Sequence, residues 1–371
     1  MNMMFVEDCC EILDSMRIPI TAIDRKEGDY PYYGANGIQD YVADYIFDDE
    51  LVLLAEDGGN FGSKERPIAY RVSGKCWVNN HAHVLKPKVG LDVDYLCYSL
   101  MFYKVDGMVN GATRQKLTQA AMRKMQIPLR CMEEQKHIVD ELNRIIKIKE
   151  QRQQELQLLD DLIKARFVEM FEDKEKAWPV VTIADICKDS RTGPFGSALH
   201  HDEFVNEGIF VLGIDNAVEN KFSYNRMRYI TEDKYQQLKR YTVYPGDVII
   251  TIMGTVGRSA VIPKDMPKAI NTKHLVCLTL NAGVVDSYFL CNAFQIHPDI
   301  KQQLRGQTKG AIMDGLNLTI IKGLKFRLPP LELQKQFLEF YNQVDKSKVA
   351  VQKALDETQT LFDSLMQEYF G

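Results

Sequence analysis

A duplicated segment constrains the fold of this chain more than any other feature. Residues 110–171 align without a gap on residues 309–370, an offset of 199, with about fifteen identities over the 62 positions. Upstream the match is looser, and residues 78–85 (VNNHAHVL) face residues 270–277 (INTKHLVC). A period near 200 residues is too long for a solenoid unit and is the size of a duplicated domain with its linker. We therefore expect a variable half followed by a shared segment, twice over.

Each shared segment is predicted to form a long helix. Apolar residues recur at spacings of three and four over residues 138–170 and 337–369, and no proline or glycine interrupts either stretch. This heptad-like stripe favours an antiparallel pair of helices over the alternative of two unrelated core helices. The residues expected to pair the helices or dock partners are Ile138, Leu142, Ile145, Leu156, Leu159, Ile163, Phe337, Tyr341, Val344, Val351, Leu355 and Phe362.

The two variable halves are predicted to be mixed α/β domains. Short β-branched runs bounded by glycine turns indicate strands at 50–57, 247–254 and 274–280. Apolar stretches at 94–103 and 287–294 indicate short helices packed on such sheets. The expected division is a first recognition domain at 1–130, a helical spacer at 131–176, a second recognition domain at 177–330 and a second spacer at 331–371.

The charge of the chain is unevenly distributed. The formal net charge is −5, which taken alone argues weakly against a nucleic-acid partner. However, residues 58–131 carry a net +8 and residues 177–330 a net +4, whereas the first 57 residues carry −11. The acidic total therefore hides basic segments.

The cysteine spacings and the short apolar runs indicate a soluble protein in a reducing compartment. The eight cysteines have irregular spacings without a CxxC pair, which is typical of reduced thiols rather than of a disulfide framework or a zinc site. No apolar run approaches 18 residues, and the first ten residues lack the features of a signal peptide. We expect a cytoplasmic protein with no membrane partner.

The usual enzymatic motifs are missing from the sequence. It has no phosphate-binding P-loop, no GxGxxG turn after a strand, no Asn/Asp-Pro-Pro-aromatic motif of amino-methyltransferases and no nuclease motif. His81 and His83 on one strand face, and the adjacent His200 and His201, have no evident cysteine or carboxylate partners for zinc. We therefore predict a binding protein without a catalytic or metal site.

Glycine- and amide-rich loops are the candidate ligand-binding segments. Residues 30–41 and 189–201 hold comparable places early in each half, and glycines there would expose backbone N–H donors to phosphates. Tyr33 and Phe195 could pack on sugars or bases, or could equally be packed rings of structural turns. The candidate set also includes threonine, asparagine, lysine and arginine residues, whose side chains can form hydrogen bonds with base edges or phosphates. The predicted DNA-binding residues are Tyr33, Gly34, Asn36, Gly59, Asn60, Lys64, Arg71, Asn79, Asn80, Arg114, Lys116, Arg191, Thr192, Gly193, Phe195, Ser197, Thr251, Thr255, Arg258, Asn271, Lys273 and Lys309.

Over essentially its full length the chain resembles the specificity subunits of type I restriction–modification enzymes. The residues that carry the resemblance are PYYGANGIQDYV (31–42), LIKARFVEMF (162–171), TGPFGSAL (192–199), YPGDVIITIMGTVGR (244–258) and LPPLELQKQF (328–337). Met253 stands where the family pattern has an arginine, which argues against direct base reading at that point.

The resemblance implies a fold, a ligand and partners. Two α/β target recognition domains would be held by two long antiparallel coiled-coil helices, and each domain would read one half of a split, asymmetric site in double-stranded DNA. The helices would dock two modification (methyltransferase) subunits, and restriction subunits would join the full complex. S-adenosylmethionine, ATP and Mg²⁺ would bind those partners, with no cofactor on this chain. The alternatives are a recognition fragment of a fused restriction–methyltransferase and a coiled-coil scaffold without a DNA role.

Overall fold

The structure is a computed structural model that describes residues 2–111, 114–172, 177–195, 198–218, 221–308 and 316–371. The chain divides into two compact units, Met1–Gln154 with Gln352–Gly371, and Glu155–Val351. Two 40-residue helices, α4 (Met132–Phe171) and α9 (Leu331–Phe370), each contribute one part to both units. The predicted long helices are therefore confirmed, and each compact unit combines a globular body with a stretch of both helices.

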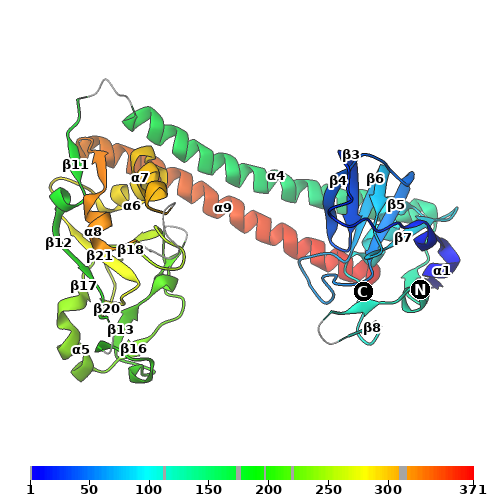
Figure 1. The fold of residues 1–371 in the computed structure, drawn as a ribbon, viewed down its shortest axis with the longest axis horizontal. Coiled ribbons are helices and arrows are strands. Elements are labelled where there is room, and N and C mark those ends of the chain that lie inside the picture. The colour runs from blue at the N-terminus through cyan, green and yellow to red at the C-terminus, as the bar shows by residue number, and fades with distance from the viewer. Residues whose placement is uncertain (1, 112–113, 173–176, 196–197, 219–220, 309–315) are drawn as a thin grey trace. The chain divides into compact units, whose positions relative to one another are not determined.

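A six-stranded sheet forms the body of the first unit (Figure 1). Its neighbouring strands are antiparallel except for β3 and β6, which run parallel. In sheet order the strands are β2 (Cys10–Ile12), β7 (Ala82–Pro87), β5 (Phe47–Ala55), β6 (Ala69–Val78), β3 (Glu27–Gly34) and β4 (Gly37–Val42). Short elements complete the unit: β1 (Met3–Phe5), α1 (Val6–Cys9), η1 (Asp14–Met16), α2 (Val93–Met101), β8 (Val109–Asn110), β9 (Lys116–Leu117), α3 (Gln119–Arg123) and β10 (Gln126–Pro128).

The central strand β5 is buried on both faces. Val52 and Leu54 belong to a core that includes α2, whereas Leu51 and Leu53 belong to a second core on the opposite face. Because both faces are covered, the strand is a continuous apolar run rather than an alternating one. This is the physical reason for the run at residues 50–57 from which a strand was predicted.

The second unit contains two four-stranded sheets. One has the order β12 (Cys187–Thr192), β21 (Leu275–Leu280), β18 (Val248–Thr251), β19 (Ser259–Val261). The other has the order β16 (Tyr229–Ile230), β13 (Ile209–Leu212), β20 (Ala269–Asn271), β17 (Thr242–Val243). The remaining elements are β11 (Val180–Thr182), η2 (Ala184–Ile186), η4 (His201–Glu203), η5 (Ile214–Asn216), β14 (Ala217–Val218), β15 (Lys221–Phe222), α5 (Glu232–Leu238), η6 (Lys239–Tyr241), α6 (Ser287–Ile296), α7 (Pro298–Thr308), α8 (Leu318–Gly323) and β22 (Lys325–Arg327).

Strand pairing repeats from one unit to the other. β2 pairs antiparallel with β7 as β12 does with β21, and β3 runs parallel to β6 as β13 does to β20. By this pairing the loop at 30–41 matches the region of β13 and not the loop at 189–201. The sequence prediction that these two loops hold comparable places is therefore wrong, because the glycines and aromatic residues they share are common to turns in general.

A buried glutamine ties the long helix to the body in the same way in each unit. Gln135 accepts a hydrogen bond from the Asp92 amide at the start of α2 (2.8 Å) and donates to the carbonyl oxygens of Gly90 and Arg130. Gln334 accepts from the Asp286 amide at the start of α6 (2.9 Å) and donates to Val284 and Pro329. These two residues are matched at the offset of 199, so the sequence repeat is also a structural repeat.

The helical stretches pack together within each unit. In the first unit Ile138, Leu142, Ile145 and Phe362 share a buried cluster with Tyr95. In the second unit, the residues buried between α4, α9 and the body include Ile163, Phe167, Phe171, Phe337 and Val344. The early part of one helix meets the late part of the other, so the stretches are antiparallel. Of the other predicted pairing residues, Val351 is buried, whereas Leu156, Leu159, Tyr341 and Leu355 are half-buried.

Candidate nucleic-acid interface

Four loops of the first unit meet beside one end of strand β5. The Asn36 side chain, in the β3–β4 turn, donates to the Gly58 carbonyl oxygen (2.9 Å), and the Gly58 amide donates to Gln115 O (3.1 Å). The Glu56 amide donates to the carbonyl oxygen of His81 in the β6–β7 turn. The structure thus brings together four segments that the sequence nominated separately. We call residues 34–37, 57–66, 79–81, 110–111 and 114–116 the first loop cluster.

The exposed side chains of the first loop cluster are mainly polar or basic. Asn36, Lys64, Asn80, Arg114 and Lys116 are exposed. Arg114 pairs with Asp57 (3.1 Å) and Lys116 with Glu56 (3.0 Å), yet their side chains stay 60% and 50% exposed. Both cations can therefore reach a phosphate outside the protein.

Other predicted residues of this unit support the loops from within. Asn79 is buried: its Oδ1 accepts from the His81 amide (2.8 Å) and its Nδ2 donates to Gln39 (3.0 Å). The Tyr33 ring is half-buried against Tyr70, whose hydroxyl donates to Gly34 O. Gly59 and Asn60 are half-buried in the loop after β5.

Arg71 lies apart from this cluster. It lies within β6 and forms ion pairs with Asp94 (3.0 Å) and Glu50. Neither carboxylate belongs to the first loop cluster. The structure therefore gives it an internal partner set rather than a place among the loops.

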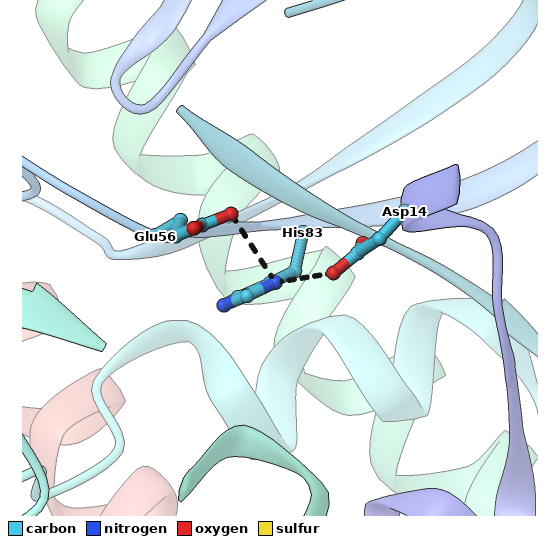
Figure 2. Close-up of side chains that lie close together, drawn as sticks. All are labelled: Asp14, Glu56 and His83. Carbon is cyan, nitrogen blue, oxygen red and sulfur yellow. Dashed lines mark hydrogen bonds and ion pairs between the residues drawn. The ribbon is translucent and has the colours of Figure 1, made fainter. Parts of the chain in front are cut away.

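A buried ionic network lies beneath the first loop cluster. Figure 2 shows the His83 ring between the carboxylates of Asp14 and Glu56. The distances from His83 Nδ1 are 2.7 Å to Asp14 Oδ2 and 3.7 Å to Glu56 Oε2. His83 Nε2 faces the Leu117 carbonyl oxygen at 2.9 Å. His83 lies in β7 and His81 in the preceding turn, so the two do not share a strand face as the sequence suggested.

Cations of the protein already balance these carboxylates. Arg17 donates to Glu56 (2.6 Å), Lys116 pairs with it from the other side, and Gln119 donates to Asp14 (2.8 Å). Burial, the largest single influence, raises the pKa of both carboxyl groups, but hydrogen bonds and positive charges together outweigh it, led by His83 at Asp14 and by Arg17 and Lys116 at Glu56, so that both pKa values are lowered. Among the described residues this is the one group of three that could offer metal ligands. Because both ring nitrogens and both carboxylates have protein partners, the network is better suited to holding loops than to binding a metal.

In the second unit, three loops meet at one edge of the β12–β21–β18–β19 sheet. Thr192 at the end of β12 faces Val276, and Thr251 at the end of β18 faces Leu275, so the loops after β12 and β18 flank the loop before β21. A Cβ atom at Gly193 would lie 2.1 Å from the Asn271 carbonyl oxygen, which means that the backbones of two loops touch there. We call residues 192–195, 252–258 and 271–274 the second loop cluster.

The predicted residues of this cluster divide into buried and exposed ones. Asn271 is fully buried, as is Thr251 at the adjoining end of β18, whereas Phe195, Thr255 and Lys273 are exposed. Residues with intermediate exposure are Thr192 and Arg258. Asn271 aligns with Asn79 in the looser upstream sequence match, and both side chains are buried.

Three more predicted residues of this unit, Arg191 among them, are not assigned to the exposed group. Arg191 is held inside the unit by Asp247 (2.6 Å) and Asp189 (2.9 Å), with 10% of its side chain exposed. Ser197 and Lys309 lie outside the described residues. The burial of its side chain distinguishes Arg191 from an arginine that binds phosphate. Nothing in the sequence indicated this burial.

Comparison with known proteins identifies the family. A family model described as the type I restriction modification DNA specificity domain matches the chain twice, over residues 1–158 and 175–358. This chain belongs to the type I restriction–modification specificity family. With two copies of the domain, it is a type I specificity subunit with two recognition domains.

Relatives of this specificity subunit cover most of its length. A putative type I restriction enzyme specificity subunit of Haemophilus influenzae is 26% identical over 346 residues, which cover 92% of this chain and 86% of that protein. The MjaVIII specificity subunit of Methanocaldococcus jannaschii is 22% identical, covering 91% of this chain and 86% of that one.

Solved structures share the fold of this specificity subunit. The type I S subunit from M. genitalium matches with a TM-score of 0.57 at 14% identity, covering 100% of this chain and 96% of that one. A chain from a study of the assembly and conformational transition of a type I system matches with a TM-score of 0.62 at 14% identity, covering 100% and 97%. In the described residues, no helix is both long and apolar enough to cross a membrane.

Proposed function

We propose that each recognition unit binds one half of a split, asymmetric site in double-stranded DNA through its loop cluster. The observation that carries this proposal is the repeated pairing of strands, which gives each unit a loop cluster at one edge of its sheet. The two clusters differ in sequence, so the two half-sites differ too. Cations at the edges would contact phosphates, and the side chains of the loop tips would contact base edges.

The exposed residues are assigned to DNA and the buried ones to support. The contacts fall to Asn36, Lys64, Asn80, Arg114 and Lys116 in the first unit, and to Phe195, Thr255, Arg258 and Lys273 in the second. Asn79, Thr251 and Asn271 hold their loops in place. Arg71 and Arg191 act through ion pairs within their units.

We further propose that the long helices dock two modification subunits and that this chain itself carries no catalytic centre. Leu158, Leu162 and Val349 lie on α4 and α9 with 68%, 47% and 61% of their surfaces exposed. Exposed apolar residues on helices that already bury another face are typical of a protein interface. Methyl transfer with S-adenosylmethionine would belong to the docked subunits, and ATP and Mg²⁺ to restriction subunits where these join.

The salt dependence of DNA binding tests the assignment of the cations. Each lysine or arginine that neutralises a phosphate contributes about 0.9 to the slope of log K against log salt. We expect Arg114→Ala and Lys273→Ala, each in the complex with its modification subunits, to lower that slope by about one. Lys353→Ala, an exposed cation on α9, is the matched control and should leave the slope unchanged. Equal slopes in all three variants would contradict the assignment.

Co-purification of the modification subunit tests whether the exposed apolar residues of α4 form the docking face. We expect Leu158→Glu together with Leu162→Glu to reduce co-purification of the modification subunit by tenfold or more, because two charges would enter an apolar contact. Gln157→Glu places a charge at a neighbouring exposed position on α4 and should have little effect. Full co-purification of the double variant would refute this face.

A further inference from the structure

One turn of the second loop cluster differs in chemistry from the rest of the candidate interface. Residues 252–258 connect β18 to β19, and residues 253–256 are all exposed. The side chains it presents are those of Met253, Thr255 and Val256, with Met253 51% and Val256 40% exposed. No charged group lies between Thr251 and Arg258.

The turn is rigid. The Thr251 hydroxyl accepts from the Arg258 amide (3.0 Å) and donates to Thr255 O, so that a fully buried side chain closes the turn from inside. The Gly257 amide donates to Thr251 O (2.9 Å), and Gln295 donates to Gly257 O (3.0 Å). A tip that is ordered before binding loses little conformational entropy on contact with a ligand.

Glycines at both ends of the tip hold it in this shape. Gly254 (φ 71°) and Gly257 (φ 84°) adopt backbone conformations that other residues rarely adopt. A Cβ atom at Gly254 would lie 3.6 Å from Ile214 Cδ1, so a second partly exposed aliphatic residue, from η5, lies against the tip. The ordered shape therefore keeps apolar side chains at the surface.

The surroundings of the tip are positively charged. The segments 192–195, 252–258 and 271–274 contain Arg258 and Lys273 and no acidic residue. Burial, followed by the positive charges of Lys273 and Arg228, lowers the pKa of His274. Arg228 is paired with Asp215 (2.6 Å). A suitable ligand for an apolar tip bordered by cations is a polyanion that also exposes an apolar group.

Duplex DNA offers such a point in the thymine methyl group. In the major groove the C5 methyl of thymine is the apolar feature that distinguishes it, and apolar side chains read it by contact. The first loop cluster, by contrast, presents the polar and basic residues Asn36, Lys64, Asn80 and Arg114. The two clusters are therefore suited to different kinds of base contact.

We propose that Met253 and Val256 make the second recognition unit read at least one thymine of its half-site through the C5 methyl group. This inference rests on the proposed function, because it requires that the second loop cluster faces DNA. It revises the expectation that Met253 has no part in base reading: the missing arginine is replaced by apolar contact. Arg258 and Lys273 hold the flanking phosphates.

Deoxyuridine substitution tests this inference, since deoxyuridine lacks only the methyl group. The duplex carries the motif that the chain and its modification subunits methylate, and each thymine of each half-site is replaced in turn. For the assembled complex we expect one replacement, in one half-site, to weaken binding about three- to fivefold, the effect of one buried methyl group. In the Met253→Ala and Val256→Ala complexes, the same replacement should have little effect.

Controls separate this inference from the proposed function. Val180→Ala truncates an exposed valine of β11 in the same unit and should keep the discrimination of the wild type. Binding that ignores every deoxyuridine, a discrimination that survives in both turn variants, or a half-site without an A·T pair would each overturn the thymine contact while leaving sequence-specific binding intact. A wild-type complex that binds all sequences alike would instead overturn the proposed function.

Discussion

At the scale of single residues, burial decides which polar side chains can meet DNA. Thr251, Asn271 and Arg191 have the residue types of DNA contacts, and each lies at or near the end of a strand. The structure gives each an internal role, because Thr251 and Asn271 are fully buried and Arg191 is paired with Asp247. Residue type reports hydrogen-bonding capacity but not exposure. The sequence analysis named Met253 only as a departure from the family pattern and did not select Val256, because residue type alone does not show that these apolar side chains are exposed.

The carboxylate of Asp14 should stabilise the first unit in a pH-dependent way. Its pKa is lowered in the folded chain, so its contribution is complete above about pH 3.8, the ordinary value, and is lost as the pH falls through the folded value. We expect Asp14→Asn to reduce the free energy of unfolding by on the order of 3 kcal/mol at pH 7, because His83 loses a buried charged partner. Urea unfolding from pH 7 to pH 3 measures this difference, which should be constant down to pH 5 and shrink below pH 4. A difference that grows in acid would contradict the network.

Gly193 should be intolerant of any side chain. A Cβ atom there would meet the Asn271 carbonyl oxygen at 2.1 Å and the Thr272 carbonyl carbon at 2.2 Å, both backbone atoms. We expect Gly193→Ala to lower the free energy of unfolding by about 1–3 kcal/mol, the usual effect of overpacking. Gly283→Ala is a matched control, since its nearest atom beyond the neighbouring residues is Asn281 Oδ1 at 3.5 Å, and should change stability by less than about 0.5 kcal/mol. Equal effects in thermal unfolding would refute the close approach.

At the scale of elements, the repeat and the apolar periodicity predicted most of the fold. The long helices, the strands β5, β18 and β21 and the short helices α2 and α6 all lie where the patterns placed them. The four-part division of the chain stays a prediction, and the compact units instead divide each long helix. Periodicity reports which face of an element is buried, but which partner covers that face depends on contacts distant in the sequence. Strand order within the sheets was beyond reach for the same reason.

The two buried glutamines should contribute equally to their units. Each makes three hydrogen bonds, to the amide that opens α2 or α6 and to two carbonyl oxygens. We expect Gln135→Ala and Gln334→Ala each to cost about 2 kcal/mol or more, because buried backbone groups lose their partners. Gln157→Ala removes an exposed glutamine of α4 that bonds Asp161, and should cost less than about 0.5 kcal/mol. Hydrogen exchange of α2 and α6 amides, read by mass spectrometry, would show each loss in its own unit, and protection unchanged in both variants would argue against the tie.

At the scale of the whole molecule, the uneven charge has a structural explanation. Acidic residues of the first 57 positions pair with basic residues of the segment 58–131. These ion pairs join Asp49 to Lys86, Glu50 to Arg71, Glu56 to Lys116 and Asp57 to Arg114. The net +8 of that segment is thus largely balanced within the first unit. Among the described residues of this unit, cations such as Arg114 and Lys116 nevertheless stay exposed at loop edges.

The DNA motif methylated by the assembled complex tests the central claim most directly. The chain is co-expressed with its cognate modification subunit in a host that lacks other adenine methylation, and N6-methyladenine is mapped by single-molecule sequencing. With two recognition units of different sequence, the account predicts one motif made of two unlike halves separated by an unspecified gap. Substitutions of the side chains proposed to contact bases in the second loop cluster, such as Met253→Ala or Val256→Ala, should relax one half alone. A single uninterrupted motif, a symmetric one, or both halves relaxed together would contradict the account.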